Sequence, residues 1–122
     1  MNLILIGYRG SGKTSVGREL SRRLGWPCID ADDLIEARAG CSIREMFETR
    51  GEPYFRDLEE EVVAEILRGN SQIISPGGGA ILRETTRARM RASGPVVWLQ
   101  GSAEVLAGDW PETEAAGSGV RD

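Results

Sequence analysis

A glycine-rich segment near the start of the chain constrains the fold more than any other feature. Residues 7–14 read GYRGSGKT and fit the pattern G-x-x-x-x-G-K-[S/T] at every fixed position. Glycines at this spacing let several backbone N–H groups point at one phosphate. A helix that starts at Lys13 directs the positive end of its dipole at the same anion. The segment therefore predicts a phosphate-binding loop between a strand and a helix.

The residues on both sides of the loop have the periodicity that this prediction requires. Residues 2–6 read as a strand with a continuous apolar run, typical of a strand buried on both faces of a parallel sheet. After the loop, Val16, Leu20 and Leu24 form one apolar stripe of a helix that Gly25 ends. A chance glycine turn is the alternative, and the flanking strand and helix weigh against it.

Further strands and helices alternate along the chain and predict an α/β fold with a right-handed parallel sheet. A capping box at Ser42–Glu45 opens one helix, and Pro53 suits the first turn of the next. The expected strands are residues 28–30, 72–75 and 95–99. The expected helices are residues 33–39, 42–50, 53–68, 84–92 and one more starting at Ala103.

The composition excludes several classes of function. The chain has 122 residues, a one-domain length, and a formal net charge of −4, so it lacks the basic patch that nucleic acid or an anionic membrane requires. It has no histidine, so any general base is a carboxylate or a group of the substrate. Cys28 and Cys41 match no metal-ligand spacing, and no signal or membrane segment is visible. These features predict free thiols in a reducing cytoplasm.

Two aspartates follow the second expected strand. In an extended segment, alternation puts the Asp30 and Asp32 carboxylates on the same side, which faces the ligand crevice at the carboxyl end of a parallel sheet. One could hold Mg²⁺ through water and the other could receive a hydroxyl proton. The alternative, that an aspartate only caps the next helix, is equally compatible with the residues.

An arginine–glutamate pair and a run of glycines complete the set of motifs. Arg56 lies three residues before Glu59, and an arginine held by an acid is a good fork for a carboxylate substrate. Taken alone, the pair is better explained as a surface ion pair. Residues 77–79 are all glycine and let backbone approach a ligand, although a plain flexible loop explains them equally well.

Together the four motifs resemble shikimate kinase. They occupy residues 7–14, 30–32, 51–59 and 77–79 in that order, and the resemblance runs from Met1 to about Leu106. It implies a P-loop kinase fold of three α/β/α layers, with parallel strands in the order 2-3-1-4-5, and a protein that is usually monomeric. It also implies transfer of the γ-phosphoryl group of ATP to the 3-hydroxyl group of shikimate, on the route to chorismate and the aromatic amino acids. The implied partners are ATP, Mg²⁺ and shikimate, without nucleic acid or membrane.

The resemblance assigns roles to individual residues. Lys13 and Asp32 are the catalytic candidates, with Lys13 on the β- and γ-phosphates and Asp32 on the shikimate hydroxyls as the base. Thr14 binds Mg²⁺ directly and Asp30 binds it through water. Arg56 grips the shikimate carboxylate and is held by Glu59. The implied ATP-binding residues are Gly10, Ser11, Gly12, Lys13, Thr14 and Ser15. The implied substrate-binding residues are Asp32, Arg56, Gly77, Gly78 and Gly79.

The chain departs from the family pattern after Leu106. Residues 107–122 have no amphipathic period, which predicts a domain over residues 1–106 and a divergent, disordered tail. The lid arginine, a second arginine for the substrate carboxylate, the adenine-binding loop, the fifth strand and the closing helix are not recognisable. The strand at residues 95–99 is then expected to be an exposed edge through which copies of the chain could associate. The hypothesis is a truncated or frame-shifted shikimate kinase with reduced or no activity.

Two other functions are compatible with the sequence. One is a catalytically inactive module that binds nucleotide or another protein, which the missing lid favours. The other is a different small-molecule kinase of the same fold, such as a gluconate kinase. Arg56 and the glycines at residues 77–79 speak against the second, because that pair suits a ring acid.

Overall fold

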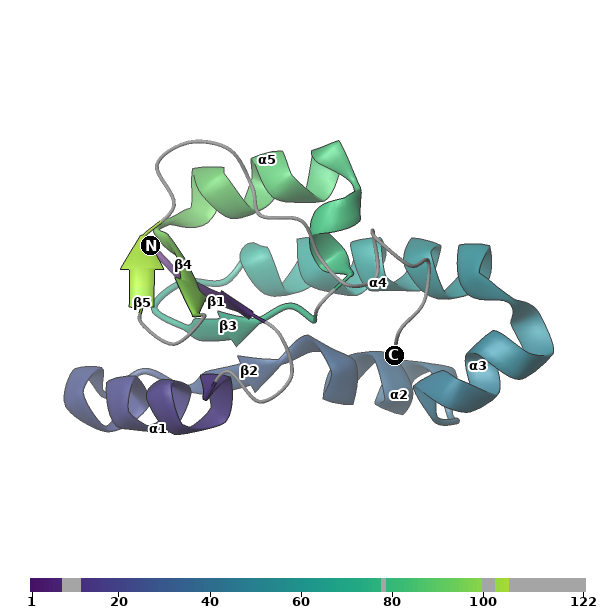
Figure 1. Cartoon of the computed structure of the whole chain (residues 1–122), viewed down its shortest axis with the longest axis horizontal. Helices are drawn as coiled ribbons and strands as arrows, with labels where there is room; N and C mark the ends of the chain where they lie inside the picture. Colours follow the sequence, from purple (N-terminus) through teal and green to yellow (C-terminus); the bar gives the residue numbers. More distant parts are fainter. Residues whose placement is uncertain (8–11, 78, 100–102, 106–122) are drawn as a thin grey trace.

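The structure, a computed structural model, consists of one sheet with helices on both faces and describes residues 1–7, 12–77, 79–99 and 103–105 (Figure 1). The strands are β1 (Leu3–Gly7), β2 (Cys28–Asp30), β3 (Ile73–Ser75), β4 (Val96–Leu99) and β5 (Ala103–Val105). Their order is β2-β3-β1-β4-β5, in which the first four are parallel and β5 is antiparallel to β4. The predicted α/β class and the order of the four parallel strands are confirmed.

The α-helices that the structure describes lie where the sequence predicted helices, with small shifts at their ends. They are α1 (Lys13–Leu24), α2 (Ala31–Ala39), α3 (Ile43–Arg50), α4 (Glu52–Leu67) and α5 (Glu84–Ser93), with a short 3-10 helix at Ala80–Leu82. Figure 1 shows α4 and α5 on one face of the sheet and α1 on the other. Helices α2 and α3 extend beyond the strand ends, so the chain between β2 and β3 builds a lobe at that edge of the sheet.

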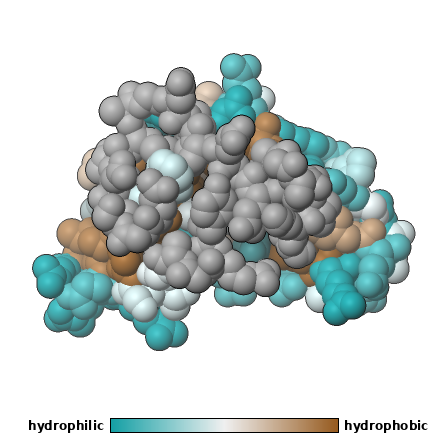
Figure 2. Space-filling view, viewed as in Figure 1, coloured by the Kyte–Doolittle hydropathy of each residue, from teal (hydrophilic) through white to brown (hydrophobic). Residues whose placement is uncertain are grey.

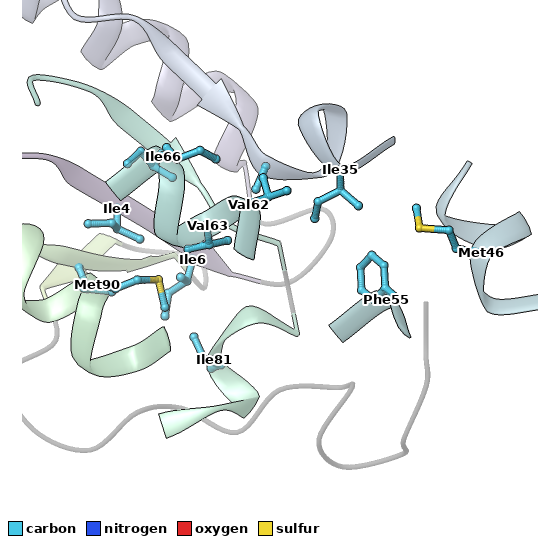
Figure 3. Packing of buried hydrophobic residues seen from close by; sticks show 13 residues of the cluster. Ile4, Ile6, Ile35, Met46, Phe55, Val62, Val63, Ile66, Ile81 and Met90 are labelled. Atoms are coloured by element: carbon cyan, nitrogen blue, oxygen red, sulfur yellow. The ribbon is translucent and has the colours of Figure 1, made fainter. Parts of the chain in front are cut away.

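Strand β1 is buried on both faces, as its apolar run predicted. Ile4 and Ile6 point into the main core, together with side chains of α2, α3, α4 and α5 (Figure 3). Leu5 points to the opposite face, against α1, where a Cβ added to Gly17 would lie 3.5 Å from Leu5 Cδ1. Glycine at position 17 therefore lets α1 pack closely on the sheet.

The face covered by α1 is less completely closed than the main core. Only Gly17 of this helix is buried, and Leu24 of its predicted apolar stripe is 45% exposed. Figure 2 shows hydrophilic residues at the C-terminal end of α1, where Arg22 and Arg23 each pair with Glu19 at 2.6 Å. Apolar surface is visible beside them in the same view. The stripe that the sequence predicted exists, and it is only partly covered by the described residues.

Two helix starts show how local side chains set element boundaries. The Ser42 side chain accepts a hydrogen bond from the Glu45 N–H at 3.1 Å, which confirms the predicted cap of α3. Helix α2 starts at Ala31, two residues earlier than predicted, because the Asp30 side chain accepts from the Asp32 N–H at 2.9 Å. The prediction that Asp30 and Asp32 share one side of an extended segment was therefore wrong: Asp32 lies in the first turn of a helix.

The end of the described chain differs from the prediction. The helix expected from Ala103 is wrong, because Ala103–Val105 form β5, with Ala103 opposite Leu99 and Val105 opposite Val97. Three residues separate β4 from β5, enough for an antiparallel hairpin and too few for the crossover that a parallel neighbour needs. Residues 97–99 thus have a partner, and the bare edge expected there is wrong. No fifth parallel strand occurs among the described residues, and the predicted tail lies outside them.

The sequence did not reveal a buried polar residue at the other end of the sheet. Asn2 is 1% exposed, and its side chain donates to Ser93 Oγ at 2.7 Å and to the Gly69 carbonyl at 3.1 Å. Its Oδ1 accepts from the Gln72 N–H at 3.1 Å. Asn2 thereby joins the segments that lead into β3 and β4, and satisfies its buried amide in doing so. Within the described ranges, no helix has the length and apolar character needed to cross a membrane.

Candidate active site

Three of the four sequence motifs follow parallel strands and therefore meet at one edge of the sheet. The glycine-rich segment begins at the last residue of β1, Asp30 ends β2 with Asp32 two residues later, and the three glycines come after β3. Asp30 pairs with Ser75 in the parallel register, so the ends of β2 and β3 are level. Strand β3 lies between β1 and β2, and the order reverses between β1 and β3. This point in an open α/β sheet is where ligands are usually bound.

The structure describes the phosphate-loop motif at Gly7, which ends β1, and again from Gly12 onward. Gly12 is the residue before α1 and has φ +90°, a left-handed conformation that glycine adopts without strain. Its carbonyl accepts from the Val16 N–H at 3.0 Å, so the helix begins at Lys13 as predicted. Thr14 and Ser15 are exposed in its first turn, where their hydroxyl groups and the N–H groups of the helix start can meet an anion. Gly10 and Ser11 lie outside the described residues.

Lys13 is half-buried beside the two aspartates. Burial lowers the pKa of its ammonium group, and the negative charges of Asp32 and Asp30 act in the opposite direction. The only lysine of the chain thus lies at a helix N-terminus and within the electrostatic reach of both carboxylates. A cation at this position can compensate the charge of a phosphate group.

The two aspartates have different surroundings. Asp30 is exposed and uses Oδ1 to cap α2, so the capping alternative is correct for this residue. Asp32 is half-buried, and burial with the nearby charge of Asp30 raises its pKa to about 6, while Lys13 opposes the rise. A carboxyl group with a pKa near neutrality is suited to accept and release a proton.

Arg56 forms a buried ion-pair cluster on α4. Its side chain is 9% exposed and its partner Glu59 is 5% exposed, with Nη1 donating to Glu59 Oε1 at 3.0 Å. Nε donates to Glu52 Oε2 at 3.1 Å, and the guanidinium carbon lies 5.0 Å from the centre of the Phe55 ring. The surface-pair alternative is therefore wrong for Arg56 and Glu59. Among the described residues, Nη2 has no hydrogen-bond partner.

Glu59 is buried between the positive charge of Arg56 and the negative charge of Asp32. Burial raises the pKa of Glu59 to about 7, Arg56 opposes the rise, and the charge of Asp32 adds to it. A carboxylate that stays charged in such a place needs its arginine, because a buried unpaired charge is strongly unfavourable. The cluster therefore holds Arg56 in a fixed position, so Nη2, which has no hydrogen-bond partner among the described residues, is a directed donor.

The glycines after β3 are adjacent to this cluster. Gly77 has φ +93°, and a Cβ built there would lie 3.0 Å from Asp32 Oδ1 and 3.4 Å from Glu59 Oε2. A Cβ built on Gly79 would overlap the guanidinium group of Arg56. Gly78 lies outside the described residues. The structure thus brings Asp32, Glu59 and Arg56 together around the glycine loop.

The oxygen atoms near Lys13 are of the kind that binds a small, hard cation. No group of three potential His, Cys, Asp or Glu ligands occurs in the part of the chain that the structure describes. Thr14 offers a hydroxyl group, and Asp30 keeps Oδ2 apart from the oxygen that caps α2. Mg²⁺ binds through one or two protein oxygens and completes its shell with water and phosphate, so these residues are compatible with it.

Glu52 is the site residue that the sequence analysis missed. It precedes Arg56 by four residues at the start of α4, a spacing at which side chains of a helix meet. That spacing was a usable signal. The burial that makes the contact part of a site was not readable from it, because burial depends on the packing of α4 against the loop after β3.

Comparisons with known proteins are consistent across sequence and structure. A family model described as shikimate kinase matches residues 9–112. The chain is 48% identical over 106 residues to the shikimate kinase of Symbiobacterium thermophilum, covering 87% of this chain and 61% of that protein. It is 47% identical over 104 residues to the shikimate kinase of Rhodopseudomonas palustris, covering 85% of this chain and 51% of that protein.

Solved structures with a similar fold carry the same name. The shikimate kinase from Acinetobacter baumannii in complex with shikimate has a TM-score of 0.78 at 38% identity, over 83% of this chain and 56% of that one. The shikimate kinase from Aquifex aeolicus has a TM-score of 0.76 at 40% identity, over 82% of this chain and 60% of that one. In each comparison this chain spans between half and two thirds of the relative's length.

Proposed function

Because this chain belongs to the shikimate kinase family, we propose that it transfers the γ-phosphoryl group of ATP to the 3-hydroxyl group of shikimate. The observation that carries the proposal is the cluster at the strand ends, where Asp32, Glu59 and Arg56 surround the glycine loop beside Lys13. The cluster combines a helix start that can bind phosphate, a proton acceptor, and a guanidinium group that can donate hydrogen bonds to a carboxylate. Phosphorylation of a hydroxyl group on a carboxylic acid substrate uses all three.

The phosphate side of the site supplies positioning and positive charge. Phosphoryl transfer needs little covalent chemistry from the protein, because most of the rate comes from aligning the groups and compensating the charge of the transferred phosphate. We assign the α1 N-terminus and the Lys13 ammonium group to the phosphates of ATP. Gly10 to Ser15 form the proposed nucleotide-binding segment.

Asp32 is the proposed proton acceptor. As the substrate oxygen forms its bond to the γ-phosphorus, its proton passes to the Asp32 carboxylate, and the bond between the γ-phosphorus and the bridging oxygen breaks to leave ADP. The raised pKa of Asp32, about 6, supports this role, because such a group is a carboxylate at neutral pH and a competent base. Its place in the first turn of α2 puts it within the reach of Lys13.

Arg56 is the proposed group that recognises the substrate carboxylate. Two of its nitrogens donate to Glu52 and Glu59, and Nη2, which has no partner in the part of the chain that the structure describes, is the proposed donor to the ligand. A charge-assisted bond from a fixed guanidinium group is short and directional, which favours an acid over a neutral sugar. The glycines at residues 77–79 complete the proposed substrate side.

Thr14 and Asp30 are the proposed protein ligands of Mg²⁺, Thr14 directly and Asp30 through water. The exposed hydroxyl and carboxylate oxygens support this assignment. The ion compensates the negative charge of the nucleotide phosphates when it is bound. We also propose a cytoplasmic monomer with a domain over residues 1–106, and the free thiols of Cys28 and Cys41 support a reducing compartment.

The proposal is tested by measuring ADP release from MgATP with and without shikimate, beside a Lys13→Ala control. We expect release that depends on shikimate and is lost in the control. Gluconate in place of shikimate tests the other small-molecule kinase, and release with gluconate alone would contradict the proposed substrate. A folded chain that binds nucleotide and releases no ADP with either acid would instead be the inactive binding module.

A further inference from the structure

Gly79 lies next to the terminal nitrogens of Arg56, the end of the side chain that a carboxylate would approach. A Cβ built on Gly79 has three nearest atoms, Nη1, Cζ at 2.6 Å and Nη2 at 2.7 Å, all in the guanidinium group of Arg56. Nε is not among them. The missing side chain therefore faces the end of the group that carries its two terminal nitrogens, not the end that is tied to Glu52.

Arg56 has little freedom to move away from an added side chain. Nε is held by Glu52 at 3.1 Å, Nη1 is held by Glu59 at 3.0 Å, and the Phe55 ring lies 5.0 Å from the guanidinium carbon. An added methyl group would therefore have to break part of the ion-pair cluster. The conformation of Gly79 does not explain the residue type, because its φ of −94° is open to any residue.

We infer that Gly79 is a positioning residue, whose missing side chain keeps the terminal nitrogens of Arg56 in place and open to the carboxylate of the substrate. The substrate part of this inference rests on the proposed function. The placement of Arg56 by Gly79 rests on the geometry of the cluster alone. The loop after β3 thus positions Arg56, in addition to any contact that its backbone makes with a ligand.

The chain offers a closely matched control at Gly69. Neither Gly69 nor Gly79 has a positive φ, and a Cβ on Gly69 would also meet the far end of a polar side chain, Gln72 Nε2 at 2.6 Å. Gln72 Nε2 donates to the Ile66 carbonyl at 2.9 Å and has a structural role far from Arg56. Gly69→Ala therefore reproduces the local crowding without touching the candidate site.

The test compares Gly79→Ala and Gly69→Ala by two readouts. The first is the NMR signal of the Arg56 Nε–H group, identified by its loss in Arg56→Met. The second is the KM for shikimate against the KM for ATP, with the melting temperature as a check on folding. We expect Gly79→Ala to shift or broaden the Arg56 signal and to raise the KM for shikimate about tenfold or more, with little change for ATP. Gly69→Ala should leave the signal and both KM values near those of the wild type.

The outcomes separate this inference from the proposed function. An Arg56 signal and a KM for shikimate that both stay at their wild-type values in Gly79→Ala would overturn the inference. A wild-type chain that shows no response to shikimate, with an Arg56 signal that still moves only in Gly79→Ala, would overturn the proposed function and support the placement of Arg56.

A combined variant keeps the test decisive if Gly79→Ala folds poorly. In an Arg56→Met background the guanidinium group is gone, so the added methyl group should cause no further loss of melting temperature. An equal loss in both backgrounds would show that Gly79 is needed for another reason and would overturn the inference.

Discussion

Helix α4 carries two groups of ion pairs that have the same chemistry and different surroundings. In its first turns, Arg56 pairs with Glu52 and Glu59, and the Arg56 side chain is 9% exposed. In its last turns, Glu65 pairs with Arg38 of α2 at 2.7 Å, and these side chains are 48% and 39% exposed. Both groups consist of an arginine between glutamates, and Arg56–Glu59 and Arg38–Glu65 have nitrogen–oxygen distances of ordinary hydrogen bonds, while Arg38–Glu61 is longer at 3.4 Å.

The surroundings change what each glutamate does. Arg38 lowers the pKa of Glu65, as expected for a carboxylate next to a cation in water. Burial raises the pKa of Glu59 to about 7 in spite of Arg56. Residue types and spacing therefore predict that an ion pair exists. Burial decides whether the pair holds its arginine rigidly enough to donate hydrogen bonds to a ligand.

Removing the buried arginine should have the largest effect. Arg56→Met leaves Glu59 without its cation in a dry place, so we expect a loss of about 3 kcal/mol in the free energy of unfolding at pH 8. Binding of shikimate should be lost as well. Urea unfolding at pH 8 and pH 6 measures the effect, which should be smaller at pH 6 because Glu59 can take up a proton. Equal, wild-type stability at both pH values would show that the pair is not buried.

The pH dependence of stability should distinguish the two groups. The folded-state pKa of Glu59 is raised from 4.5 to about 7, so the folded chain binds one more proton than the unfolded chain between these values. The contribution of Glu59 to stability therefore falls as the pH rises from about 4.5 to 7.

Urea unfolding midpoints of the wild type and Glu59→Gln, measured across this pH range, test the direction of the effect. The variant should lose the fall in stability with rising pH that Glu59 causes. Glu65→Gln is the matched control. The pKa of Glu65 is lowered, so its contribution is present above the unfolded pKa and is lost as the pH falls. If Glu59→Gln and Glu65→Gln changed the pH dependence of stability in the same direction, the expected difference between the buried and the exposed glutamate would be contradicted.

Exchanging the buried arginine for lysine should have an intermediate effect. Arg56→Lys keeps the positive charge for Glu59 and loses the planar fork that holds Glu52, Glu59 and a ligand at once. We expect most of the stability to remain and the KM for shikimate to rise about tenfold. Steady-state kinetics with shikimate and ATP varied in turn measures the split. A rise in the KM for ATP alone would place Arg56 on the wrong side of the site.

Changing the exposed arginine should have the smallest effect. In Arg38→Met the partners Glu61 and Glu65 remain solvated, because all three side chains are largely exposed. We expect the urea midpoint and both KM values to match those of the wild type within error. A loss comparable with that of Arg56→Met would mean that burial does not distinguish the two groups.

Much of the fold could be predicted because it depends on neighbours along the chain. The apolar run of β1, the glycine before Lys13 and the Ser42 cap each act within a few residues. The prediction failed at Ala103, where a three-residue connection placed the next segment antiparallel to β4. It also failed to place Asp32 in a helix, because Asp30 was free to serve as a cap or as a strand residue.

The sequence by itself determined the phosphate-binding motif, the alternation of strands and helices, and the residue types that can handle phosphate, proton and carboxylate. Tertiary structure alone decided which of them come together in the proposed site. Asp32, Glu59 and Gly79 are many positions apart in the chain, and the parallel order of β2 and β3 together with the packing of α4 brings them close to one another. Burial at that meeting point raises the pKa values of Asp32 and Glu59 and fixes Arg56, and burial depends on packing between segments that are distant in sequence.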